Sequence, residues 1–177
     1  MKTVIARNSL LLGTFALVTA GLLALTNEGT RDLIAEAERK AAQKALLEII
    51  PLDRHDNDLL SDVVDIDKRY WSALGLSEGG KINVARRQGK TVATIFPAVA
   101  PDGYSGAIKM IVGINADGSV AGVRVLSHSE TPGLGDKVDL KKSQWILGFD
   151  GKSLSQPEAD RWLVKKDGGD FDQFTGA

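Results

Sequence analysis

The segment from Asn8 to Asn27 carries no charged residue and is rich in Leu, Ala, Val and Thr. Its length of roughly 20 residues is enough for a helix to cross the hydrocarbon core of a bilayer. A cleaved signal peptide is the alternative. Such peptides have a shorter apolar core and a cleavage site of small residues, to which Ala24-Leu25-Thr26 is a poor match. We therefore expect residues 8–27 to form a retained transmembrane anchor.

The charged residues before this segment are positive, and the first ones after it are mainly negative. Lys2 and Arg7 precede it, and Glu28 and Asp32 follow it. Positively charged flanks stay on the cytoplasmic side of a membrane. We therefore expect residues 1–7 in the cytoplasm and the main domain on the opposite side of the membrane.

Composition narrows the function of that domain. The 177 residues are enough for one domain with an appendage. The sequence contains no Cys, which excludes disulfides, thiolate metal sites, haem attachment through Cys and iron–sulfur clusters. A net charge of −1 gives no indication of nucleic-acid binding. His55 and His128 lie far apart without companion ligands, so no metal site is expected.

Residues 28–50 place apolar side chains at helical spacing, and Pro51 ends that pattern. We interpret this segment as a stalk or packing helix. A helix lying on the membrane surface is less favoured, because the polar face mixes both signs of charge. The Asp-rich segment that follows lacks the central Gly and terminal Glu of a calcium-binding loop. Residues 28–80 are therefore predicted to be a connecting helix and loop.

Residues 81–177 form the predicted main domain, in which strands dominate. Short β-rich segments separated by turns predict strands over 82–86, 91–99, 107–114 and 120–126, with a bulge near Gly122. Helices are predicted over 140–149 and 156–163. This order predicts an α+β fold, in which helices pack on an antiparallel sheet.

The segment from Ser129 to Asp136, with the sequence Ser-Glu-Thr-Pro-Gly-Leu-Gly-Asp, follows the last predicted strand. Its Pro stiffens the turn, and its two glycines allow backbone to approach a planar ring or a phosphate without an intervening Cβ. Glu130 and Thr131 supply polar groups. Without further information such a segment is more often a plain loop.

Three further features accompany this loop. The tail ends in Thr175-Gly176-Ala177, a small-residue turn that follows the segment from Lys165 to Phe174. Tyr104-Ser105-Gly106 precedes the strand predicted at 107–114, and its tyrosine is either a core residue or part of a site. Trp145 and Phe149 are interpreted as core residues, with ring stacking near a cofactor as the alternative.

Taken together, these segments resemble the FMN-binding domain family, found in the G subunit of the Rnf electron-transport complex and in the C subunit of the sodium-pumping NADH:quinone reductase. Ala100 to Gly106 and Lys165 to Ala177 are more similar to the Rnf member. The resemblance implies FMN bound covalently by a phosphoester to a Thr that closes a Ser/Thr-Gly-Ala-Thr motif. The implied cofactor-binding residues are Tyr104, Ser129, Glu130, Thr131, Gly133, Leu134, Gly135, Thr175, Gly176 and Ala177.

The acceptor threonine is expected directly after Ala177, where the sequence ends. Three explanations of this ending are open. The chain is shortened, its remainder lies beyond these 177 residues, or the threonine is omitted because it is modified. We favour the last two, and no residue of the 177 is assigned as the flavin acceptor.

The resemblance also implies a function. The chain would be the redox subunit of an ion-translocating ferredoxin:NAD⁺ oxidoreductase (Rnf complex), a translocase, in a bacterial inner membrane with its main domain in the periplasm. It would work with other membrane subunits and would have no complete activity alone. The sequence contains no dinucleotide-binding fingerprint, P-loop or nucleophile elbow. The C subunit of the quinone reductase is one alternative, and a membrane-tethered scaffold without a working cofactor is another.

Overall fold

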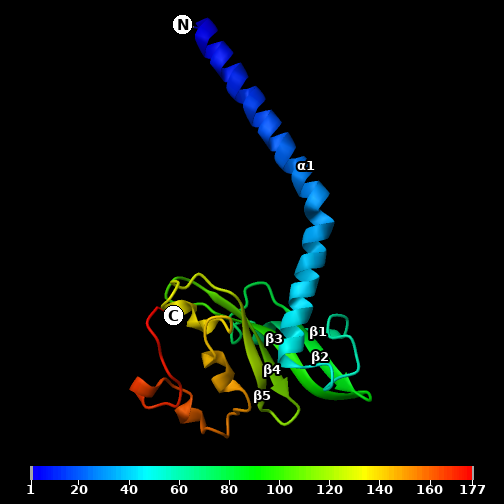
Figure 1. The fold of residues 1–177 in the computed structure, drawn as a ribbon, viewed down its shortest axis with the longest axis vertical. Coiled ribbons are helices and arrows are strands. Elements are labelled where there is room, and N and C mark those ends of the chain that lie inside the picture. Colours follow the sequence, from blue (N-terminus) through cyan, green and yellow to red (C-terminus); the bar gives the residue numbers. More distant parts are fainter. Residues whose placement is uncertain (1, 177) are drawn as a thin grey trace. The chain divides into compact units, whose positions relative to one another are not determined.

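The computed structural model describes residues 2–176, and the chain divides into two compact units between Ala42 and Gln43. Helix α1, Lys2–Ile49, supplies the whole first unit, and its last residues belong to the second (Figure 1). The helix predicted over residues 28–50 is thus confirmed as the second half of a longer one. Pro51 follows its end, as expected for a residue that lacks a backbone N–H.

The first half of α1 contains a stretch, Arg7–Ala24, that is long and apolar enough to span a membrane. Large apolar side chains along it, such as Leu12 and Phe15, are exposed. The Thr19 hydroxyl is satisfied within the helix, because it donates to the Phe15 carbonyl oxygen at 2.8 Å. Exposed apolar side chains and internally satisfied polar groups are what a lipid environment requires.

The second unit is built on five antiparallel strands arranged in sequence order. They are β1 Val63–Asp65, β2 Lys81–Arg87, β3 Lys90–Ala100, β4 Ile108–Asn115 and β5 Val120–Ser127. The predicted α+β class and the four longer strands are confirmed. The expected bulge lies at Ala121, since Gly122 pairs with Gly113 while Val120 pairs with Ile114. Strand β1 was missed, because its three residues lie in the segment predicted to be loop.

One face of the sheet packs against the end of α1. Leu46, Ile49 and Ile50 are buried against this face, where Ile111 of β4 also points. Gly113 and Gly122 lie beneath Ile49, and a Cβ on Gly113 would be 2.3 Å from the Ile49 Cγ2 atom. Arg124 of β5 donates to the Glu48 carbonyl oxygen at 3.0 Å, which caps the helix end. These contacts join the end of α1 to the sheet.

The opposite face of the sheet lies under the segments that follow β5. Met110, Val112 and Ile114 alternate with Ile111 along β4 and point to this second face, as the period of two predicts. Val123 lies beside them, and Ile146 packs on it from above. This second face carries the candidate site.

The helices predicted over 140–149 and 156–163 are wrong in type and extent. The structure has short 3-10 turns instead, η3 Trp145–Phe149 and η4 Ala159–Arg161. Side chains compete with helix formation here, since the Asp139 carboxylate accepts from Lys141 N–H and the Ser143 hydroxyl oxygen from Trp145 N–H. Further 3-10 turns are η1 Lys68–Tyr70, η2 Gly135–Val138 and η5 Lys165–Asp167.

Candidate cofactor-binding site

The two segments singled out from the sequence meet in space. Gly135, in the loop after β5, lies against Gly176, in the turn at the end of the chain. A Cβ on Gly135 would lie 1.5 Å from the carbonyl oxygen of Gly176, and Gly176 itself has φ of +88°. Both positions therefore require glycine, the first for space and the second for backbone conformation.

The loop from Ser129 to Asp136 is held by its own hydrogen bonds. The Thr131 carbonyl oxygen accepts from Leu134 and Gly135 N–H at 3.1 and 3.0 Å. The Asp136 carboxylate accepts from Gly133 N–H at 2.9 Å, which fastens the glycine at φ of +80°. Sequence reasoning did not assign a role to Asp136, although its position three residues after Gly133 is typical of a side chain that caps a turn.

Glu130 is the most buried charged residue near this loop, with 3% of its surface exposed. Its Oε1 atom accepts from Ser105 N–H at 3.2 Å, and the absence of a side chain at Gly103 leaves room for that oxygen. Among the described residues no donor reaches its Oε2 atom. A buried polar atom without a partner is uncommon in proteins. The hydrogen bond from Ser105 to the other carboxylate oxygen ties the turn that carries Tyr104 to the loop.

The remaining predicted residues line the outside of this junction. Tyr104 is 77% exposed, so a core role for it is wrong. Leu134 is half exposed, its Cβ lies close to Gly176, and Ser129 and Thr175 are exposed. Ala177 lies outside the described residues. The structure thus brings both motifs and the Tyr104 turn to one end of the sheet.

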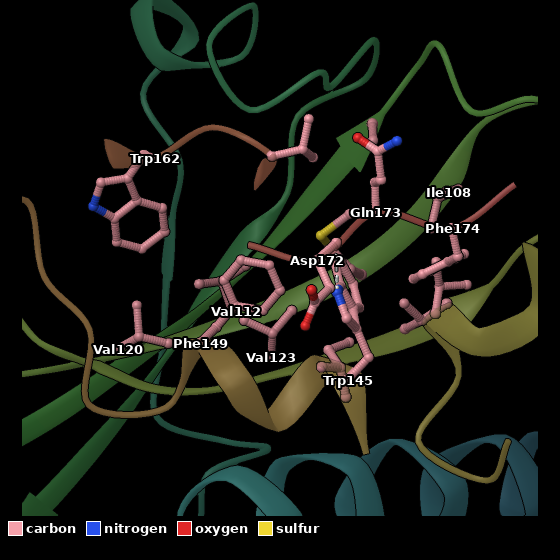
Figure 2. Close-up of a pocket in the computed structure, with 16 residues that line it drawn as sticks. Ile108, Val112, Val120, Val123, Trp145, Phe149, Trp162, Asp172, Gln173 and Phe174 are labelled. Atoms are coloured by element: carbon pink, nitrogen blue, oxygen red, sulfur yellow. Dashed lines mark hydrogen bonds between the residues drawn. The ribbon is translucent and has the colours of Figure 1, made fainter. Parts of the chain in front are cut away.

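Beside this junction an apolar cavity of about 450 Å³ opens on the second face of the sheet. Figure 2 shows its wall of valines from β4 and β5, with Trp145 and Phe149 from η3 and Trp162 beyond them. Asp172, Gln173 and Phe174 form the side from which the chain continues to Thr175. Trp145 and Phe149 lie four residues apart in the sequence, but this spacing does not predict a cavity.

Aromatic rings hold the tail beside the cavity. The Trp145 indole N–H donates to the Asp172 carbonyl oxygen at 2.9 Å, and its ring meets Phe174 edge-on at 5.1 Å. Phe171 stacks on Phe149 at 4.7 Å. The hydrogen bond from Trp145 contributes about 0.5–1.5 kcal/mol to stability, and each ring pair contributes a similar amount. The exposed ion pair between Lys165 and Asp172 contributes about 0–1 kcal/mol.

Both histidines already have partners. His55 is buried, and its Nδ1 atom lies 3.1 Å from the Pro51 carbonyl oxygen. The His128 Nδ1 atom accepts from Glu130 N–H at 3.1 Å, which places this ring against the loop. His128 therefore helps to orient the loop backbone.

Among the residues that the structure describes, two carboxyl groups outside the loop have a shifted pKa. A hydrogen bond from the Ser119 hydroxyl lowers the pKa of Asp117 in the β4–β5 turn, and one from Ser119 N–H adds to this. Burial raises the pKa of Asp150 at the end of η3, although nearby Arg124 opposes that shift. Both lie outside the loop and tail described above.

Comparison with known proteins identifies two regions of the chain. Residues 1–49 match the model of the RnfG N-terminal region, and residues 103–177 match that of the FMN-binding domain. The second match includes the loop, the Tyr104 turn and the tail. The two regions therefore contain both the membrane-spanning candidate and the candidate site.

Relatives that match over most of the chain are G subunits of ion-translocating oxidoreductase complexes. The one from Pseudomonas aeruginosa is 53% identical over 97% of this chain and 79% of the relative. The one from Pseudoalteromonas atlantica is 48% identical over 100% of this chain and 81% of the relative. The one from Vibrio atlanticus is 47% identical over 100% of this chain and 83% of the relative. The resemblance seen in the sequence is confirmed, and the chain belongs to the family of G subunits of ion-translocating oxidoreductase complexes.

Proposed function

We propose that this chain is the flavoprotein subunit of a membrane-bound ion-translocating ferredoxin:NAD⁺ oxidoreductase complex and carries electrons through one FMN. The observation that carries the proposal is the contact between Gly135 and Gly176, which joins the predicted flavin loop to the predicted attachment turn. The flavin supplies the redox chemistry when it is bound. The protein supplies position, exclusion of water and tuning of potential.

We also propose that the FMN is attached covalently to the chain. A threonine directly after Ala177 would hold FMN through a phosphoester between its hydroxyl and the FMN phosphate, and the adduct would add the mass of one FMN less one water. Gly176, with its φ of +88°, turns the backbone just before the acceptor. Thr175 is exposed and shapes the turn, and the acceptor is the next threonine.

The residues around the turn fit a bound flavin. Gly133 leaves the loop backbone bare, because a Cβ built there would have no atom within 4 Å apart from those of its chain neighbours, whereas Gly135 is covered by Gly176. Exposed Tyr104, Ser129 and Leu134 offer an aromatic face, a hydroxyl and an apolar contact. The buried Glu130 Oε2 atom, which no donor among the described residues reaches, is a further hydrogen-bond acceptor in this loop. Together these groups orient a planar ring and its polar side chain.

The membrane arrangement completes the proposal. Residues 1–7 lie in the cytoplasm, residues 8–27 form the anchor in the bacterial inner membrane, and the main domain lies in the periplasm. Residues 28–80 connect the anchor to the flavin-binding domain, 81–177. The partners are the other membrane subunits of the complex, with which this redox subunit completes the translocase, and the membrane lipid around the anchor. Nucleic acid is not a partner.

The direct test uses the native subunit isolated from membranes. After boiling in detergent, its band on a gel should fluoresce as a flavin does, because unfolding does not release a covalently bound group. Changing the threonine after Ala177 to Ala should abolish the fluorescence and leave the amount of protein in the membrane unchanged. A native band without fluorescence would reject the covalent flavoprotein and favour a scaffold role.

A further inference from the structure

Trp145 lies where the tail of the chain passes the cavity, and its side chain contacts that tail twice. We propose that Trp145 is the positioning residue for the attachment turn, acting through the tail segment, here defined as residues 170–176. This inference rests on the proposed function of that turn. It assigns to Trp145 a task that the family resemblance did not assign.

The two contacts reach alternating residues of the tail segment. The indole N–H donates to the Asp172 carbonyl oxygen at 2.9 Å, the bond drawn as a dashed line in Figure 2. The ring meets Phe174 edge-on, with the centroids 5.1 Å apart and the planes at 87°. One contact holds the main chain and the other holds a side chain two residues later. Together they fix both the position and the rotation of the segment that leads into Thr175.

Trp145 is itself held firmly by the sheet. It begins η3, where its own N–H donates to the Ser143 hydroxyl oxygen at 3.1 Å. Its neighbour Ile146 is 2% exposed and packs with Val120 and Val123 of β5. Because Trp145 packs on the sheet, its indole holds the tail segment, which has no strand or helix of its own, in a fixed position.

Other contacts of the tail segment cannot replace this one. Arg161 binds the Asp170 carboxylate and the Gly168 carbonyl oxygen, which lie at and before the start of the segment. Lys165 pairs with the Asp172 side chain, but both groups are largely exposed to water. Within residues 2–176, no other hydrogen bond reaches the main chain of residues 172–176. Loss of the indole N–H would leave the main chain of that stretch with no hydrogen bond among the described residues, and only the packing of Gly176 on Gly135 would remain.

Trp162 provides a matched control. It belongs to the same aromatic cluster, with its ring 5.2 Å from Phe171 and 6.3 Å from Phe149. Its indole N–H also donates to a backbone carbonyl oxygen, that of Ser153, at 3.1 Å. That bond holds a different loop. Trp145→Phe and Trp162→Phe therefore remove the same kind of hydrogen bond and keep an aromatic ring, but only the first releases the tail segment.

The experiment compares both variants in the full-length subunit, produced together with its flavin transferase. The initial rate of flavin attachment should fall about fivefold in Trp145→Phe, as expected for one lost hydrogen bond, and less than about twofold in Trp162→Phe. Amide hydrogen exchange at residues 172–176 should become faster only in Trp145→Phe. The thermal midpoints of the two variants should change by similar amounts.

Equal attachment rates or equal exchange at residues 172–176 in the two variants would overturn the proposal. Should Trp145→Phe fail to fold, Phe174→Leu removes the second contact of the same pair and carries the same two expectations. Hydrogen exchange needs no cofactor. A wild-type subunit without flavin would therefore count against the proposed function, while the exchange result would still decide the role of Trp145.

Discussion

Gly135 and Gly176 are separated by about forty residues in the sequence, yet a methyl group on Gly135 would lie 1.5 Å from the Gly176 carbonyl oxygen. The loop and the turn proposed for flavin attachment are therefore in direct backbone contact. Side chains cannot be fitted between them, so their relative position is set by main-chain geometry.

Gly135→Ala should push the attachment turn away from the loop, because the methyl group would meet backbone rather than a flexible side chain. Flavin attachment, measured as fluorescence per unit of subunit on a denaturing gel, should fall at least about fivefold, since overpacking costs about 1–3 kcal/mol. Gly148→Ala is the control, because nothing lies within 4 Å of a Cβ there. Normal attachment in Gly135→Ala would show that this contact does not matter.

Gly133→Val should act through the backbone and the cofactor. The position has φ of +80°, where a branched side chain is strained by about 1–2 kcal/mol. The valine side chain would crowd no neighbouring segment of the protein. An effect on flavin loading or redox potential beyond that of the backbone strain would therefore come from the space that the side chain takes from the ligand. Gly89→Val, in the β2–β3 turn at φ of +74°, imposes the same strain without that effect. If flavin loading and redox potential were the same in Gly133→Val and Gly89→Val, this loop would not be part of the flavin site.

The junction between the end of α1 and the sheet gives a prediction about stability. Gly113→Ala would place a methyl group 2.3 Å from Ile49 Cγ2, and buried Ile49 has little room to move. The free energy of unfolding of the second unit should fall by about 1–3 kcal/mol, measured by denaturant titration. In Gly148→Ala it should stay within about 0.5 kcal/mol. Equal stabilities would mean that the helix end is not packed tightly on the sheet.

The charges around the anchor predict its orientation. A reporter fused after Ile50 should be active only on the outer side of the cytoplasmic membrane, because the positive charges of Lys2 and Arg7 favour the cytoplasmic side for the N-terminus. The subunit should also stay with membranes during a high-salt wash. Reporter activity in the cytoplasm would reverse the proposed topology, and release by salt would favour cleavage of the apolar segment.

Much of this fold could be predicted because its elements have local signals. The four longer strands follow the alternation of apolar residues and the turns between them, as with Ile108 to Ile114 in β4. The end of α1 follows from Pro51. By contrast, β1 has only three residues and depends on pairing with β2, which its own sequence does not reveal.

The site was predictable in part. The loop glycines can be singled out because glycine lets backbone approach a planar ring or a phosphate, and the tail glycine follows from the family resemblance, but neither signal predicts that the two segments meet. The burial of Glu130 and the two contacts of Trp145 could not be identified, because they depend on segments distant in sequence, Ser105 for the first and Asp172 for the second. The expected helix over 140–149 failed because the capping side chains of Asp139 and Ser143 favour turns.

Whether the flavin is covalently bound can be read from the intact mass of the native full-length subunit isolated from membranes. This mass should exceed that of the polypeptide by one FMN less one water, with the adduct on a threonine directly after Thr175-Gly176-Ala177. A native mass equal to that of the unmodified polypeptide would contradict covalent attachment, and an adduct mapped to Thr175 would contradict the assigned acceptor.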